Sequence, residues 1–256
     1  MILPEIDPII FQIGPIAVRW YSLTWLAAFY TIYILIKRYQ KDLNADQVND
    51  LMFYSLLGAI IGGRAGYVFF YSINQFFDNP LSIFFIWEGG LSFHGGLLGV
   101  LVACLWLSRG WGVNFFWLMD RVAPFVPPGL GLVRLGNFMN SELLGRPTEM
   151  SWGVIFPSDP LGLTRHPSQL YQAIGEGILL FFYMLWVIKK PKPRMNISGH
   201  FLVGYGLIRF VTEFFRTPDQ HIGFSAFEVL TRGQLLCIPM IVIGMLLIYY
   251  SYRKQN

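Results

Sequence analysis

Four polar side chains recur along one otherwise apolar segment in the last quarter of the chain. Tyr205, Arg209, Glu213 and Arg216 follow at spacings of four, four and three residues, so they share one helical face. An Arg209–Glu213 pair that only fastens neighbouring helices is the simpler interpretation, but a pair needs two members and this stripe has four. The pattern therefore favours a site that binds an anionic group.

A second group of donors and acceptors lies in a glycine-rich stretch between residues 129 and 145. Arg134, Asn137, Asn140 and Glu142 supply the polar groups. Glycines that permit close backbone approach stand at Gly129, Gly131, Gly136 and Gly145. Glycines also pack membrane helices tightly, so the pattern alone is weak evidence. Together with an arginine in an apolar segment it favours an anion site.

His94 is the third feature, because two glycine pairs, at 89–90 and 95–96, flank it. Such a setting predicts an unwound backbone that lines a cavity. The near-neutral pKa of histidine suits a general base, although a lone histidine is more often a hydrogen-bonded structural residue. Both interpretations stay open.

Three further residues have less certain roles. Arg64 and Glu176 stand in apolar segments and could pair with each other, with Asp120 or Arg121, or with the polar stripe. Ser168 precedes an apolar run and is expected to cap its first turn.

The composition predicts that these residues are positioned by membrane helices. Apolar residues make up 54% of the 256 residues and charged residues only 13%, about half the share in a soluble domain. The basic residues are scattered between apolar stretches, which argues against a nucleic-acid partner. Cys104 and Cys237 stand far apart in apolar segments and are expected to be small core residues, and no metal-ligand pattern is present.

Apolar runs near the length of a membrane span number seven, so we expect an all-α integral membrane protein with about seven transmembrane helices in a single domain over residues 1–256. The runs are Trp20–Ile36, Leu51–Tyr71, His94–Leu107, Phe115–Val133, Gln169–Ile188, His200–Phe215 and Leu235–Tyr252. Segments near residues 72–93 and 134–167 are expected to form a surface-lying aromatic stretch and a small outer cap.

Lysines set the expected orientation, because short loops rich in basic residues stay on the cytoplasmic side. With seven spans, all six lysines fall on one side, which predicts an outer N-terminus and an inner C-terminus. The lysines are Lys37, Lys41, Lys189, Lys190, Lys192 and Lys254. The basic residues within the helices or on the outer side are all arginines, whose planar fork suits phosphate or carboxylate. They are Arg19, Arg64, Arg121, Arg134, Arg146, Arg165, Arg209, Arg216 and Arg232.

These motifs, in this order, resemble those of the bacterial phosphatidylglycerol:prolipoprotein diacylglyceryl transferase family, and the similarity covers nearly the whole chain. The resemblance rests on Arg19-Trp20-Tyr21, Gly62-Gly63-Arg64, His94-Gly95-Gly96-Leu97, the stretch Arg134 to Gly145, Arg165 to Tyr171, and the stripe Tyr205 to Arg216. The loop from Gly145 to Arg165 looks short for the family, which leaves the details of the cap open.

The resemblance implies a multi-pass enzyme of the bacterial cytoplasmic (inner) membrane that moves the diacylglyceryl group of phosphatidylglycerol onto the lipobox cysteine of a prolipoprotein, without a cofactor. A thioether forms, glycerol phosphate leaves, and the nucleophilic sulfur belongs to the peptide. Residues expected to bind substrate are Arg134, Asn137, Asn140, Glu142, Gly145, Tyr205, Arg209 and Glu213.

Four residues are expected to take part in the chemistry itself. Arg134 and Arg209 would hold the phosphate as its charge localises. His94 could act as base or only orient substrate, while Tyr21 or Glu213 could position or relay the proton.

Two other classes of protein remain as alternatives. In a transporter or flippase, the arginines would line an anion path instead of a reaction centre. The absence of an internal repeat counts against it. A passive lipid-binding subunit would explain the aromatic residues but not so many arginines in apolar segments.

Overall fold

The computed structural model describes residues 1–14, 16–218, 224–226 and 230–253, so the predicted cytoplasmic Lys254 lies outside the described residues. The chain packs as two compact units. The large unit comprises Met1–Gln12, Ala17–Ile32 and Asp120–Asn256, and the small unit comprises Ile13–Ile16 and Tyr33–Met119. A single domain over residues 1–256 stays a prediction.

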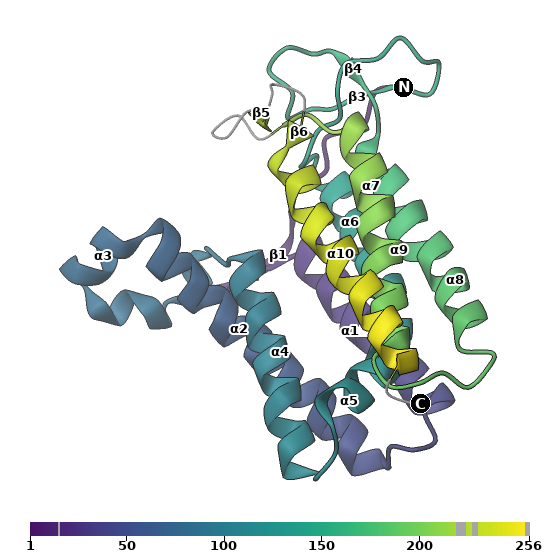
Figure 1. Cartoon of the computed structure of the whole chain (residues 1–256). Helices are drawn as coiled ribbons and strands as arrows, with labels where there is room; N and C mark the ends of the chain where they lie inside the picture. Colours follow the sequence, from purple (N-terminus) through teal and green to yellow (C-terminus); the bar gives the residue numbers. More distant parts are fainter. Residues whose placement is uncertain (15, 219–223, 227–229, 254–256) are drawn as a thin grey trace. The chain divides into compact units, whose positions relative to one another are not determined.

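The large unit is a bundle of helices capped at one end by short strands (Figure 1). Within it, α9 packs along α10, and α6 packs against α7 and the π-helical stretch η4. Its helices are α1 (Trp20–Tyr39, which continues into the small unit), α5 (Phe115–Val122, which begins in the small unit), η3 (Ala123–Phe125), α6 (Val126–Met139), α7 (Ser168–Gln172), η4 (Ala173–Leu179), α8 (Leu180–Val187), α9 (Asn196–Thr212), η5 (Glu213–Phe215) and α10 (Arg232–Arg253).

The predicted run Phe115–Val133 is broken into three helical pieces instead of one. Pro124 lies in the 3₁₀ turn η3, and Pro127 and Pro128 begin α6, because prolines lack the N–H that a helix interior requires. Helix α6 then continues past the predicted end to Met139, so Arg134 lies inside a helix and the cap begins after it.

The cap is held together by a small apolar core and the N-terminal residues. Strands β3 (Val154–Ile155) and β4 (Thr164–Arg165) pair antiparallel, and the Leu3 N–H donates to the Ile155 carbonyl at 3.0 Å. Leu3, Val154 and Phe156 are buried together. The other strands are β1 (Ile9–Ile13) with β2 (Ile16–Arg19), and β5 (Phe224–Ala226) with β6 (Leu230–Thr231).

The small unit is built on two long helices, α2 (Ala45–Tyr71) and α4 (Phe93–Gly110), which pack against each other. A side chain at Gly62 would collide with the Gly95 carbonyl, so glycine permits this close crossing. Between them lie α3 (Ile73–Asp78), η1 (Pro80–Phe84) and η2 (Ile86–Glu88), where Phe77, Phe84 and Trp87 are exposed. That this segment lies at a membrane surface stays a prediction.

All seven predicted apolar runs are helical where the structure describes them. Four helical segments of the described chain are long and apolar enough to cross a membrane: Ala45–Tyr71, Phe93–Gly110, Ser168–Val187 and Arg232–Arg253. The protein is therefore mainly helical with several potential membrane spans. Seven spans and the orientation of the termini stay predictions.

Candidate active site

Three helices of the large unit bring two arginines to one buried carboxylate. Arg134 comes from α6, Glu176 from η4 and Arg209 from α9. The Arg134 Nε donates to Glu176 Oε2 at 3.0 Å, and Arg209 Nε lies 3.9 Å from Glu176 Oε1. Glu176 is fully buried. It lies in a π-helical stretch, a local irregularity that recurs at functional sites.

The second carboxylate, Glu213, lies one turn along from Arg209. Its Oε2 is 2.6 Å from Arg209 Nη2 and 3.9 Å from Arg216 Nη1. The Thr231 hydroxyl donates to Glu213 Oε1 at 3.1 Å. At Gly233, the start of α10 comes so close that an added Cβ would lie 2.6 Å from Glu213 Oε1. Two elements outside α9 therefore hold this carboxylate in place.

We call Arg134, Glu176, Arg209, Glu213 and Arg216 the arginine–glutamate cluster. Its three guanidinium groups and two carboxylates sum to a formal charge of +1. The Arg209 Nη1 is buried and has no hydrogen-bond partner within the described part of the chain. Since an unpaired charged donor in a buried place is costly, about 1–3 kcal/mol or more, this nitrogen is suited to an incoming anion. The predicted Tyr205 also neighbours Arg134 and Glu176.

The predicted polar groups after Arg134 form a hydrogen-bonded network at the cap end of α6. Asn137 Nδ2 donates to Glu142 Oε2 at 3.0 Å, and Asn140 Nδ2 donates to Glu142 Oε1 at 3.1 Å. The Gln169 amide donates to the Glu142 carbonyl. The sequence predicts Asn137, Asn140 and Glu142 as substrate-binding residues but does not predict a role for Gln169, which links this network to α7.

Gly145 connects the cap to the end of α9. It bridges Arg216 in backbone pairing, and its carbonyl accepts from Thr217 Oγ1 at 2.8 Å and from Arg165 Nη1 at 3.2 Å. An added Cβ at Gly145 would collide with the His166 carbonyl. Its role in the structure is thus to let three backbone segments meet, and a direct contact with substrate stays a prediction.

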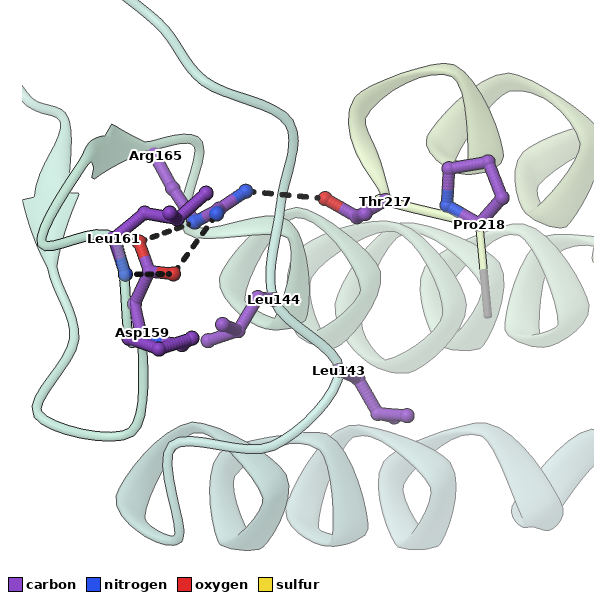
Figure 2. A pocket seen from close by; sticks show the side chains of 8 residues that line it. Leu143, Leu144, Asp159, Leu161, Arg165, Thr217 and Pro218 are labelled. Carbon is purple, nitrogen blue, oxygen red and sulfur yellow. Dashed lines mark hydrogen bonds and ion pairs between the residues drawn. The ribbon is translucent and has the colours of Figure 1, made fainter. Parts of the chain in front are cut away.

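A cavity of about 240 Å³ lies in the cap (Figure 2). Leu143, Leu144, Asp159, Pro160, Leu161, Arg165, Thr217 and Pro218 line it. The Arg165 guanidinium on its wall is already committed, because Nε and Nη2 donate to the Asp159 carboxylate at 2.8 and 2.9 Å. Arg165 holds the pKa of Asp159 down at about 2 through these bonds. The cavity therefore offers less free positive charge than the arginine–glutamate cluster.

Tyr21 and His94 lie in different units. Tyr21 belongs to α1 of the large unit, and one turn along from it Thr24 packs against Gly136 of α6. His94 lies in the first turn of α4 in the small unit, exposed, with its ring against Phe93. The catalytic roles proposed for both residues stay predictions.

The prediction of an unwound backbone on both sides of His94 holds for one glycine pair and is wrong for the other. Gly89 and Gly90 have positive φ values of 83° and 78°, so the chain does turn sharply there. Gly95 and Gly96, however, lie in a regular helix with Ser92 as its N-cap. Gly95 packs α4 against α2 and does not unwind the chain.

Three other expectations need correction. Arg64 pairs with none of the suggested acidic residues, because its guanidinium donates to backbone carbonyls of residues 82, 83, 89 and 90. Asp120 instead caps the start of α9, accepting from Met195 N and Ser198 N at 2.8 Å each. Ser168 does not cap its helix, because its hydroxyl donates to the Leu143 carbonyl.

Glu176 pairs with Arg209 of the polar stripe, which confirms one of the partners that the sequence left open. Its pairing with Arg134 is not among those alternatives. Glu176 follows Gln169 by seven residues and Gln172 by four, so these polar residues share one helical face, as the residues of the Tyr205–Arg216 stripe do. This spacing is the sequence signal that Glu176 belongs to a polar site. The described residues contain no group of histidine, cysteine and acidic side chains suited to a metal ion.

The helices and the largely buried ionic cluster define a mainly helical protein with several potential membrane spans and a polar centre in its larger unit. The family model of prolipoprotein diacylglyceryl transferase matches residues 8–250. The chain belongs to this family and is accordingly a transferase.

Individual relatives agree. The chain is 47% identical to the phosphatidylglycerol–prolipoprotein diacylglyceryl transferase of Pseudomonas putida, over 98% of this chain and 96% of the relative. It is equally similar to the proteins of that name from Acinetobacter baumannii strain SDF, over 98% and 95%, and from Vibrio atlanticus, over 99% and 93%.

Proposed function

We propose that the chain transfers the diacylglyceryl group of phosphatidylglycerol to the cysteine thiol of a prolipoprotein lipobox. The C–S bond forms as the bond between the glycerol carbon and the phosphate oxygen breaks. The thiol proton passes to a base, and glycerol phosphate leaves with the electron pair. The family membership supports this reaction, and the contacts of the arginine–glutamate cluster support the proposal that the reaction takes place there.

The single observation that carries the site is the shared carboxylate between Arg134 and Arg209. Because Glu176 holds both guanidinium groups from different helices, it pre-positions two forked donors at one point. As the departing phosphate gains negative charge, donors already in place stabilise it without reorganisation. The net positive charge of the cluster favours the same anion.

The base is proposed to be His94, with Tyr21 or Glu213 positioning or relaying the proton. Glu213 Oε2 lies 2.6 Å from Arg209 Nη2. This ion pair supports a role for Glu213 in positioning other groups more than a role as the base. A pH–rate profile of His94→Gln tests the assignment. We expect a large loss of turnover and the loss of the limb that reports the base, whereas a normal rate with an unchanged profile removes His94 from this role.

The enzyme is proposed to be a multi-pass protein of the bacterial inner membrane, with seven spans and the cap on the outer side. With seven spans, all six lysines would fall on one side and the 134–167 segment on the other, which supports this orientation. Phosphatidylglycerol would then enter from the bilayer, and the lipobox would meet the cluster from the cap side.

A transfer experiment separates this function from transport. The purified protein is incubated in vesicles with phosphatidylglycerol labelled in its acyl chains and with a lipobox peptide. Label that appears on the peptide, and fails to appear when the peptide cysteine is serine, supports the transferase. Label that crosses the bilayer without covalent change supports a flippase instead.

A further inference from the structure

Three polar side chains follow one face of the helix that carries Glu176. Gln169 and Gln172 in α7 and Glu176 in η4 are spaced by three and four residues, and each is 0% exposed. This face packs between α6 and α9, which supply Arg134 and Arg209. It therefore leads from the cap into the arginine–glutamate cluster.

The two ends of this face have protein partners, and its middle has none. Gln169 donates to the Glu142 carbonyl, and Glu176 accepts from Arg134. Among the described residues, neither Nε2 nor Oε1 of Gln172 has a hydrogen-bond partner, whereas Gln169 and Glu176 each lack one only at Oε1. Because each unmade buried hydrogen bond costs about 1–3 kcal/mol, an amide in this position is expensive for the protein alone. Such groups in membrane helices are typical of binding sites.

The position of Gln172 relative to the cluster suggests which group it meets. Gln172 precedes Glu176 by four residues, about one helical turn, so it lies roughly 5–6 Å from Glu176 on the cap side. In phosphatidylglycerol, four or five bonds separate phosphorus from the hydroxyl oxygens of the head glycerol, about 5–6 Å when extended. With the phosphate at Arg134 and Arg209, those hydroxyls reach the level of Gln172.

The chemistry of the side chain fits the same group. A carboxamide both donates and accepts, as a hydroxyl does, and it carries no charge that competes with the arginines for the phosphate. A site built to bond a hydroxyl also rejects analogues that lack it, because its own polar atoms are then left unpaired.

We propose that Gln172 determines headgroup specificity by binding a hydroxyl of the head glycerol while Arg134 and Arg209 hold the phosphate. The inference rests on the proposed function and deepens it. It assigns the recognition of the leaving group to a residue that is separate from the arginine–glutamate cluster.

The test compares two lipids that yield the same product. Phosphatidylpropanol has the same phosphodiester and acyl chains as phosphatidylglycerol but no hydroxyl on its headgroup. The ratio of kcat/KM for the two lipids is measured in the wild type and in Gln172→Met, whose side chain has a similar length and shape. We expect the wild type to prefer phosphatidylglycerol about tenfold or more, and Gln172→Met to lose most of that preference.

Asn196→Leu is the matched control, because Asn196 is also 0% exposed with an unpartnered oxygen but lies at the other end of α9. It is expected to keep the wild-type ratio even if its stability falls. Should Gln172→Met fail to fold, the wild-type ratio still decides, since a ratio near one overturns the proposal.

The outcomes distinguish failure of the role of Gln172 from failure of the proposed function. Transfer from phosphatidylglycerol that shows no preference between the lipids overturns the role of Gln172 alone. A Gln172→Met variant with a raised KM for the peptide and an unchanged lipid ratio also overturns it, and points to the peptide backbone as the ligand. No transfer by the folded wild type overturns the proposed function itself.

Discussion

Largely buried arginines occur in both units, but their partners differ in kind. In the small unit, Arg64 donates to four backbone carbonyls and stacks over Tyr67 at 5.7 Å. In the large unit, Arg134 and Arg209 share the carboxylate of Glu176, and one nitrogen of Arg209 remains unpartnered. The carbonyls that bind Arg64 move away only if their segment unfolds, whereas one carboxylate shared by two guanidinium groups leaves part of their positive charge uncompensated. The first arrangement suits structure and the second suits binding.

The largest expected effect follows from removing a guanidinium of the cluster. We expect Arg134→Ala to abolish transfer in a folded protein, and Arg134→Lys to lower kcat by about 10²–10³-fold, because an ammonium lacks the planar fork. Transfer of labelled diacylglyceryl to a lipobox peptide measures this effect. Wild-type turnover in either variant would remove Arg134 from phosphate binding.

The next effect is on stability and comes from the shared carboxylate. Glu176→Gln removes the carboxylate that two largely buried guanidinium groups share, which is expected to cost up to about 3–5 kcal/mol. Thermal unfolding in detergent would show a clear fall in Tm, and added phosphatidylglycerol should recover part of it by binding the exposed charge. An unchanged Tm would mean that the cluster is solvated and not buried.

In the small unit, Arg64→Gln is expected to loosen the segment between α2 and α4 and to lower the rate of transfer far less than Arg134→Lys does. Hydrogen bonds from a charged donor contribute about 1.5–3 kcal/mol each, so several are lost at once. Hydrogen exchange at residues 79–91 should speed up, with no matching change in α9. If Arg64→Gln instead stops transfer while exchange is unchanged, the contrast between the two arginine environments is wrong.

The helices were predictable from sequence because twenty apolar residues leave few alternatives in a membrane. The stripe of Arg209 and Glu213 followed from helical spacing. The partners of Arg64 did not, because backbone carbonyls leave no mark on the side-chain sequence. The break at Pro124 was readable in principle, but the continuation of α6 to Met139 depended on packing against η4. The pairing of Glu176 with arginines of α6 and α9 likewise depends on tertiary packing, which the local sequence does not reveal.

A smaller effect concerns the cap, where Asp159 is bound by Arg165. Its pKa in the folded protein is about 2, lowered from 3.8, so its contribution to stability is present above pH 3.8. That contribution is lost as the pH falls from there towards 2. We expect Asp159→Asn to remove this acid-labile part of the stability of the cap, measured by proteolysis of the 145–165 loop between pH 5 and about 2. Identical acid sensitivity in the variant would contradict the assignment.

The smallest effect is expected from the cysteines. Cys104 and Cys237 are both buried and free, and the nucleophilic sulfur is proposed to come from the peptide. The double variant Cys104→Ala with Cys237→Ala should therefore transfer at the wild-type rate. Loss of activity in the folded double variant would show that a thiol of the enzyme takes part.

The central claim is that the arginine–glutamate cluster receives the lipid phosphate. A structure of the protein with phosphatidylglycerol and no acceptor peptide tests it most directly, since the lipid can bind but not react. The account predicts the phosphate within hydrogen-bond distance of both Arg134 and Arg209, with the head glycerol towards Gln172. A headgroup bound elsewhere, while both arginines keep only Glu176 and Glu213 as partners, would contradict it.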